Sequence, residues 1–110
     1  MTLDDLRSMG VNVDEALKRC LDNEKFYFKM IDKCLNDDNF ARLGQALDDG
    51  DMDQAFEYAH AIKGVVSNLA LTPLQEKISE LTDLLRAHAQ TDYNDLYASL
   101  IKLKEEMLRL

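Results

Sequence analysis

The sequence predicts an all-α fold, an antiparallel up-and-down four-helix bundle with an extra short N-terminal helical segment. β-branched residues are few and nowhere alternate with polar residues as a strand requires. Apolar residues recur at helical spacing, and helix-start signals divide the chain into segments of helical length. Because short connections join consecutive segments, neighbouring helices are expected to be antiparallel.

The helix starts are marked by capping residues. Asn12 is followed three residues later by Glu15, and Asp51 by Gln54. In this arrangement the first side chain caps the helix and the second reaches back to the capping residue. Both pairs therefore predict the first turn of a helix.

Two further starts lie in the second half of the chain. Thr72 precedes Pro73, and a proline at the first helical position gives up an amide that has no partner there. Asp92 is placed to cap the last helix, and the LDDGD stretch at 47–51 predicts a turn. The expected helices are a short turn at 3–8, then about 13–35 (with or without a break near Asn23), 39–48, 52–70, 73–89 and 93–109.

The apolar residues of the second half form stripes that would face a common core. The stripes are Ala55, Ala59, Ile62, Val66 and Leu69, then Leu74, Ile78, Leu81 and Leu85, then Leu96, Leu100, Leu103 and Met107.

Length and charge restrict the class of protein. The 110 residues, 46% hydrophobic and 31% charged, suffice for one globular domain, and Met1 with this compact length favours a free-standing protein. Thirteen basic against twenty-one acidic residues give a net charge of −8, which argues against nucleic acid or an anionic membrane as partner. No apolar run could span a bilayer, and the N-terminus lacks the features of a secretory signal. We expect a monomer that meets other proteins.

The two cysteines do not suggest a metal site. Cys20 and Cys34 are too far apart for a CxxC motif, and no pair of histidines supplements them. We interpret them as reduced thiols in or near the core, which favours a cytoplasmic location.

The stretch EYAHAIKGVVSNLAL, residues 57–71, contains the candidate functional site. His60 lies at the edge of the core face, and Lys63, Gly64 and Ser67 follow on the same side of the helix. Phe56 and Glu57 lie one turn before His60 on that side. A glycine inside a helix costs about 1 kcal/mol relative to alanine, so Gly64 needs a reason. Close approach of a neighbouring helix is one, but this stripe is polar.

These residue types fit phosphoryl transfer. A neutral imidazole is a good nucleophile towards phosphorus, and phosphorylation adds nearly two negative charges that an ammonium one turn away would stabilise. The missing side chain at Gly64 would let the active site of a partner approach the imidazole. With a nucleophile and a cation but no nucleotide loop or metal ligands, the chain resembles half of an active site.

The segment AHAIKGVVSNLA is similar to the signature of histidine-containing phosphotransfer (Hpt) domains: a His, a hydrophobic residue two positions on, then Lys-Gly, and an Asn further along. The resemblance extends roughly from Val13 to Leu108. The chain departs from the family at Ala70, where a Gly is common, which we interpret as a change at a helix-packing position.

The resemblance implies a phosphorelay intermediate that is not an enzyme by itself. His60 would accept a phosphoryl group from an aspartate of a receiver domain, belonging to a response regulator or a hybrid histidine kinase, and pass it to another receiver. Lys63 would support the phosphoryl group. Gly64, Phe56, Glu57 and Ser67 would give access or contact to the receiver, which would supply Mg²⁺ because this chain has no cofactor of its own.

Two alternatives stay open at this point. The phosphoacceptor and dimerisation fragment of a sensor kinase also uses a helical His, but that His is usually followed closely by an acidic residue or Asn and by a Pro. Here Pro73, the only proline, begins another helix. A helical interaction module without phosphotransfer would explain the acidic surface and the bundle, but would leave Gly64 without a purpose.

Overall fold

The computed structural model describes residues 1–110, and it contains helices and no strands, which confirms the all-α prediction. The helices are α1 (Leu3–Ser8), α2 (Val13–Arg19), α3 (Glu24–Leu35), α4 (Asn39–Asp48), α5 (Met52–Asn68), α6 (Thr72–Arg86) and α7 (Tyr93–Leu108). The segment expected over 13–35 is two helices, because Asn23 begins α3 by accepting a hydrogen bond from the Phe26 amide.

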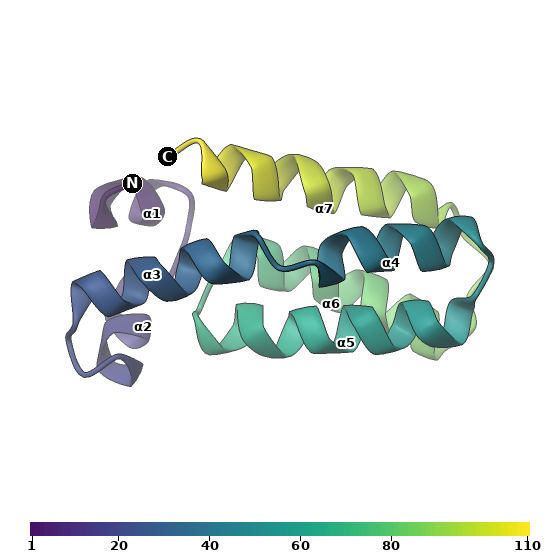
Figure 1. Ribbon diagram of the computed structural model, residues 1–110, viewed down its shortest axis with the longest axis horizontal. Helices are drawn as coiled ribbons and strands as arrows, with labels where there is room; N and C mark the ends of the chain where they lie inside the picture. Colours follow the sequence, from purple (N-terminus) through teal and green to yellow (C-terminus); the bar gives the residue numbers. More distant parts are fainter.

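The whole molecule measures 41 × 23 × 20 Å, and helices α4 to α7 make up its body. α5 contacts α4 and α6, and α7 contacts α6 and α4. Figure 1 shows these four helices lying along the long axis, with α3 extending the line of α4 and with α1 and α2 at one end. None of the seven helices has both the length and the apolar character needed to cross a membrane.

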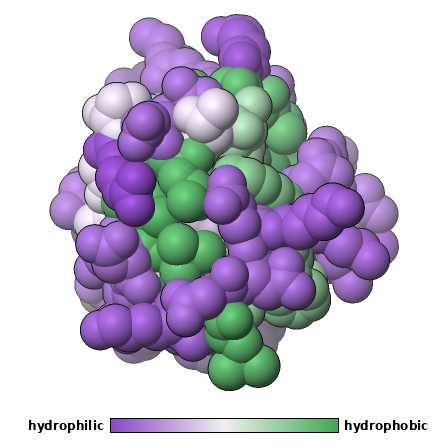
Figure 2. All heavy atoms as spheres, turned by 90° about the vertical axis from the view of Figure 1, so that its left-hand side faces the viewer, coloured by the Kyte–Doolittle hydropathy of each residue, from purple (hydrophilic) through white to green (hydrophobic).

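A single hydrophobic core joins all seven helices. It contains Leu6 of α1 and Val13 of α2 together with the stripes of α5 and α6. The N-terminal helices therefore pack onto the same core as the body. Figure 2 views the end of the molecule where α1 to α3 lie, and hydrophobic residues gather in the middle of that face. Leu21 and Phe26 are 90% and 47% exposed, so part of the apolar surface there is left open.

Three expected helix starts differ in detail: at Asp51 the side chain caps α5, but Gln54 does not reach back. The Asn12 side chain accepts from the Glu15 amide at 3.3 Å, as predicted, but Glu15 does not reach back. The Asn12 amide donates instead to the Ala70 carbonyl at 3.2 Å, because the turn after α5 packs against it. At α6, Thr72 is already helical and caps nothing; its hydroxyl donates to the Ala70 carbonyl.

The C-terminus of α5 is held by the N-terminal helices. The Arg19 guanidinium of α2 donates to the carbonyls of Ser67 and Asn68 at 2.9 and 3.0 Å. The Tyr27 hydroxyl of α3 donates to the Leu69 carbonyl at 2.9 Å, and burial raises the pKa of Tyr27 to about 12, so it stays a donor. With the Asn12 amide on Ala70, four successive carbonyls at the end of α5 accept hydrogen bonds from residues 12–27.

Gly44 of α4 packs tightly against the Tyr97 side chain of α7. A Cβ added at Gly44 would lie 2.5 Å from the Tyr97 hydroxyl oxygen, closer than any real contact. That hydroxyl donates to the Phe40 carbonyl at 2.8 Å, which fixes the ring over the glycine. Gly44 is therefore required for helix packing.

Five helices end in the same motif, with a left-handed residue just after the last helical turn. In α6 the His88 amide donates to the Leu85 carbonyl and the Ala89 amide to the Leu84 carbonyl, the pairing of a Schellman motif. The left-handed residues are Gly10 and Gly50 but also Leu21, Ala70 and His88. Ala70 is buried in the core, which agrees with a packing position, and its φ of 54° adds a second reason for a glycine there that the sequence alone did not indicate.

We expect His88→Gly to raise the free energy of unfolding by about 1 kcal/mol, since His88 is exposed and has φ of 54°. Gly50→Ala is the matched control: φ is 72° and nothing lies within 4 Å of an added Cβ, so it should lower that free energy by a similar amount. Chemical denaturation measures both. A His88→Gly protein less stable than wild type would contradict the backbone argument.

Candidate functional site

The orientation of His60 follows from the core face of α5. Ala55, Ala59, Ile62 and Val66 are all buried, as their spacing predicted. His60 follows directly after Ala59 and is turned out to solvent, where it is exposed. α5 itself begins at Asp51, whose side chain accepts from the Gln54 amide at 3.2 Å. Burial of this face thus leaves the imidazole at its edge, in solvent.

The imidazole of His60 is stacked on Phe56, one turn earlier. The ring centroids are 5.8 Å apart and the planes differ by 23°. The Arg86 guanidinium of α6 lies 5.5 Å from the centroid of the same Phe56 ring, and it is paired with Asp83 at 3.1 Å. His60 is therefore connected through Phe56 to the neighbouring helix.

Lys63 and Gly64 lie where the sequence placed them, one turn after His60. Lys63 is half-buried, which is less exposed than a free surface charge would be, and it forms no ion pair. Gly64 is exposed, and an added Cβ would meet nothing within 4 Å. No neighbouring helix therefore requires the glycine, and the space beside the imidazole is open.

The remaining predicted site residues flank this region. Glu57 is exposed and Ser67 is half-buried. The Ser67 carbonyl is bonded to Arg19, so α2 adjoins the surface at this end of α5. The structure thus brings Phe56, His60 and the neighbouring Arg86 together, whereas Ser67 lies beside the N-terminal helices.

Sequence reasoning missed an exposed apolar strip on α5. Ala61 is exposed and Val65 is 43% exposed, and the two are one turn apart next to His60 and Gly64. Together with residues of α3 and α4 they line a shallow groove formed by Cys34, Asp37, Asn39, Phe40, Ala61, Ile62 and Val65. An apolar pair outside the core stripe was the available signal. No sequence signal pointed to Arg86, because its contact with Phe56 depends on how α6 packs against α5.

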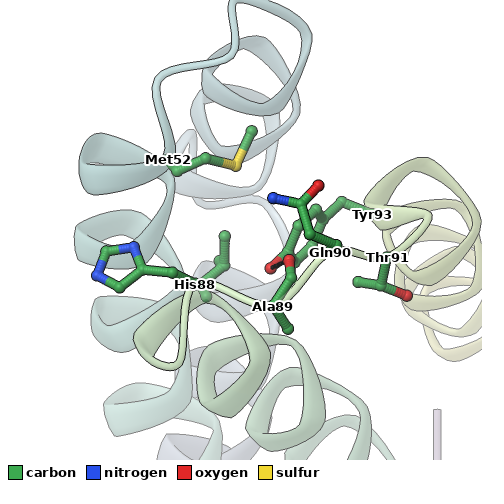
Figure 3. Close-up of a pocket in the computed structure, with 7 residues that line it drawn as sticks. Met52, His88, Ala89, Gln90, Thr91 and Tyr93 are labelled. Carbon is green, nitrogen blue, oxygen red and sulfur yellow. Dashed lines mark hydrogen bonds between the residues drawn. The ribbon is translucent and has the colours of Figure 1, made fainter.

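The second histidine has different surroundings. His88 borders a hollow of about 420 Å³ formed by Met52, Leu85, His88, Ala89, Gln90, Thr91 and Tyr93. Figure 3 shows its ring pointing away from Gln90 and Tyr93. The Tyr93 hydroxyl donates to the carbonyls of Leu84 and Ala89, which closes the connection between α6 and α7. No lysine or glycine stands on a helical turn after His88.

Comparison with protein families identifies the class of this site. A model of the Hpt domain matches residues 35–110, which include α4 to α7 and His60. The chain belongs to the Hpt domain family, as its resemblance indicated. Hpt domains are phosphotransfer modules of phosphorelays and interact with receiver domains and kinases of two-component systems. The searches of curated proteins and of solved structures found no match.

The two helical glycines predict opposite effects of the same substitution. Gly64→Ala should raise the free energy of unfolding by up to about 1 kcal/mol, because the space is open and alanine favours the helix. Gly44→Ala should lower it by about 1–3 kcal/mol through the clash with Tyr97. Thermal melting compares the two. A Gly64→Ala protein that melts clearly below wild type would show that Gly64 is structural.

Proposed function

We propose that His60 is the phosphoacceptor of a phosphorelay intermediate, which takes a phosphoryl group from the aspartate of one receiver domain and passes it to another. The observation that carries the proposal is the exposed His60 on α5, one turn before Lys63 and an unobstructed Gly64, within the segment that matches the Hpt family. Helices α4 to α7 would form the antiparallel four-helix bundle that presents this surface.

The transfer is a substitution at phosphorus. The lone pair of one imidazole nitrogen attacks the phosphorus, and the bond from phosphorus to the aspartyl oxygen breaks, leaving its electron pair on the carboxylate. The other ring nitrogen loses its proton to solvent, so a neutral imidazole becomes a neutral phosphorylated ring. Passage to the next receiver reverses these changes with a different carboxylate.

Electrostatics explains why a partner is required. The phosphoryl group brings nearly two negative charges next to the exposed carboxylate of Glu57, and Lys63 is the cation on the same side of the helix. One ammonium does not neutralise the transition state, so the receiver would contribute Mg²⁺ and its acidic pocket. The chain would act as a phosphotransfer protein and not as an independent catalyst. It would do so in the cytoplasm and as a monomer.

The contact surface for the receiver would surround His60. The open position at Gly64 and the apolar side chains of Ala61 and Val65 would admit the receiver face, with Glu57 and Ser67 at its border. Exposed apolar side chains beside an open glycine favour docking there, because a bound receiver would remove the Val65 side chain from water.

We expect phosphorylation at His60 alone. Incubation with receiver domains charged with acetyl phosphate should give an acid-labile label that is absent from His60→Gln and retained in His88→Gln, because only His60 has a lysine and an open glycine one helical turn after it. Label that survives in His60→Gln would contradict the assignment. A wild-type protein that no receiver labels would instead favour an interaction module.

We expect Lys63→Ala to slow transfer about ten- to a hundredfold while the melting temperature changes little. Loss of one charge-assisted contact to the phosphoryl group costs roughly 1.5–3 kcal/mol, and Lys63 has no ion pair whose loss would weaken the fold. Single-turnover transfer measures the effect, with Lys102→Ala on α7 as the control for charge alone. Equal rates in Lys63→Ala and wild type would leave Lys63 as a solvated surface charge.

A further inference from the structure

We infer that Phe56 is a positioning residue for phosphoryl transfer, which holds the plane of the His60 imidazole and is itself held from α6 by Arg86. This inference rests on the proposed function of His60. It assigns Phe56 a task other than contact with the receiver, which is the role that its place on the helix first suggested.

The Phe56 ring lies where it can restrain the imidazole. A helical side chain points back towards the preceding turn, so His60 covers the residue four positions before it. The centroid separation of 5.8 Å and the angle of 23° lie within the range of favourable offset stacks. Unlike His60, Phe56 is half-buried, so it is the more fixed of the two rings.

Stacking restrains the imidazole without blocking its chemistry. The nucleophilic lone pair of an imidazole nitrogen lies in the plane of the ring, whereas Phe56 covers a face of it. The stack therefore limits rotation of the ring while both nitrogens stay open at its edge. In-line attack on a phosphoaspartate held in a receiver pocket needs this direction to be fixed, and a displacement of about an ångström can cost on the order of a hundredfold.

Arg86 restrains Phe56 from the next helix. Its guanidinium carbon is 5.5 Å from the Phe56 centroid, a cation–π distance, and Asp83 fixes the guanidinium by a hydrogen bond of 3.1 Å. Phe56 and Arg86 also share the wall of a hollow of about 270 Å³ with Asp53, Glu57, Leu85 and His88. The Phe56 ring thus has a partner on α6 that does not depend on a bound receiver.

The test separates positioning from docking. Wild type, Phe56→Leu and Phe56→Tyr are compared in single-turnover transfer from a receiver domain that phosphorylates the wild-type protein, over a range of receiver concentrations. We expect Phe56→Leu to lower the maximal rate about tenfold and to leave the half-maximal receiver concentration within twofold. Phe56→Tyr, which keeps the ring, should retain the wild-type rate.

Two controls sharpen the comparison. Phe28→Leu makes the same change in a half-buried phenylalanine of α3 that stacks on Tyr27 at 6.4 Å, and it should transfer normally. Phosphoramidate, a small donor that adapts to any ring orientation, should phosphorylate Phe56→Leu and wild type at rates within twofold. Arg86→Gln should change the maximal rate from the receiver in the same direction as Phe56→Leu, by about three- to fivefold.

Several results would overturn the inference. A normal maximal rate in Phe56→Leu with a raised half-maximal concentration would make Phe56 a docking residue. Equal losses with phosphoramidate and with the receiver would mean that the ring alters the nucleophile and not its orientation. If Arg86→Gln transfers at the wild-type rate, Arg86 has no part in positioning Phe56. If His60 is not the acceptor, either label survives in His60→Gln or the wild-type protein takes no label, so failure of the proposed function is distinguishable.

Discussion

Burial of one face of α5 is the constraint on which the rest of the structure depends. Small residues at Ala55 and Ala59 and larger ones at Ile62 and Val66 are all removed from water, and α4 and α6 pack on this helix. Hydrophobic burial is the main favourable contribution to folding, so it fixes the rotation of the helix about its axis. His60 is one residue beyond this face and has no freedom to turn inward. The exposed nucleophile is therefore a direct consequence of core packing.

The two interior glycines show how one residue type answers different demands. Gly44 is buried under the Tyr97 ring, and the space that its missing side chain leaves is filled by the molecule itself. Gly64 is exposed and its space is empty. Glycine in a helix is less favourable than alanine, and packing against Tyr97 offsets this cost at Gly44. Nothing within the chain offsets it at Gly64. The unoffset cost at Gly64, one turn from His60, is the physical argument that something outside this chain uses the space.

Local chemistry explains which features the sequence could predict. The caps Asn12, Asp51 and Asp92 and the core stripe of α5 depend on residues within one or two turns, and the structure has them. The left-handed conformation of Ala70 and His88 could not be predicted from these two residues, since neither prefers it and it accompanies the hydrogen bonds that close the ends of α5 and α6. For the candidate site, the i, i+4 relation of Phe56 and His60 was visible, but the contact with Arg86 depends on the packing of α6 against α5.

The carbonyls at the end of α5 connect the helices outside the family match to the surface around Gly64. Residues Ser67 to Ala70 are bonded by Arg19, Tyr27 and the Asn12 amide, all of which precede residue 35. By thermodynamic linkage, an effect of one end of this connection on the other is matched by an equal effect in the reverse direction. If a ligand at the Gly64 end of α5 weakens or strengthens these bonds, the docking of α2 and α3 changes by the same free energy. The first 34 residues would in that case act as an accessory element, because whatever a ligand does to their docking on α5, that docking does to the affinity of the ligand.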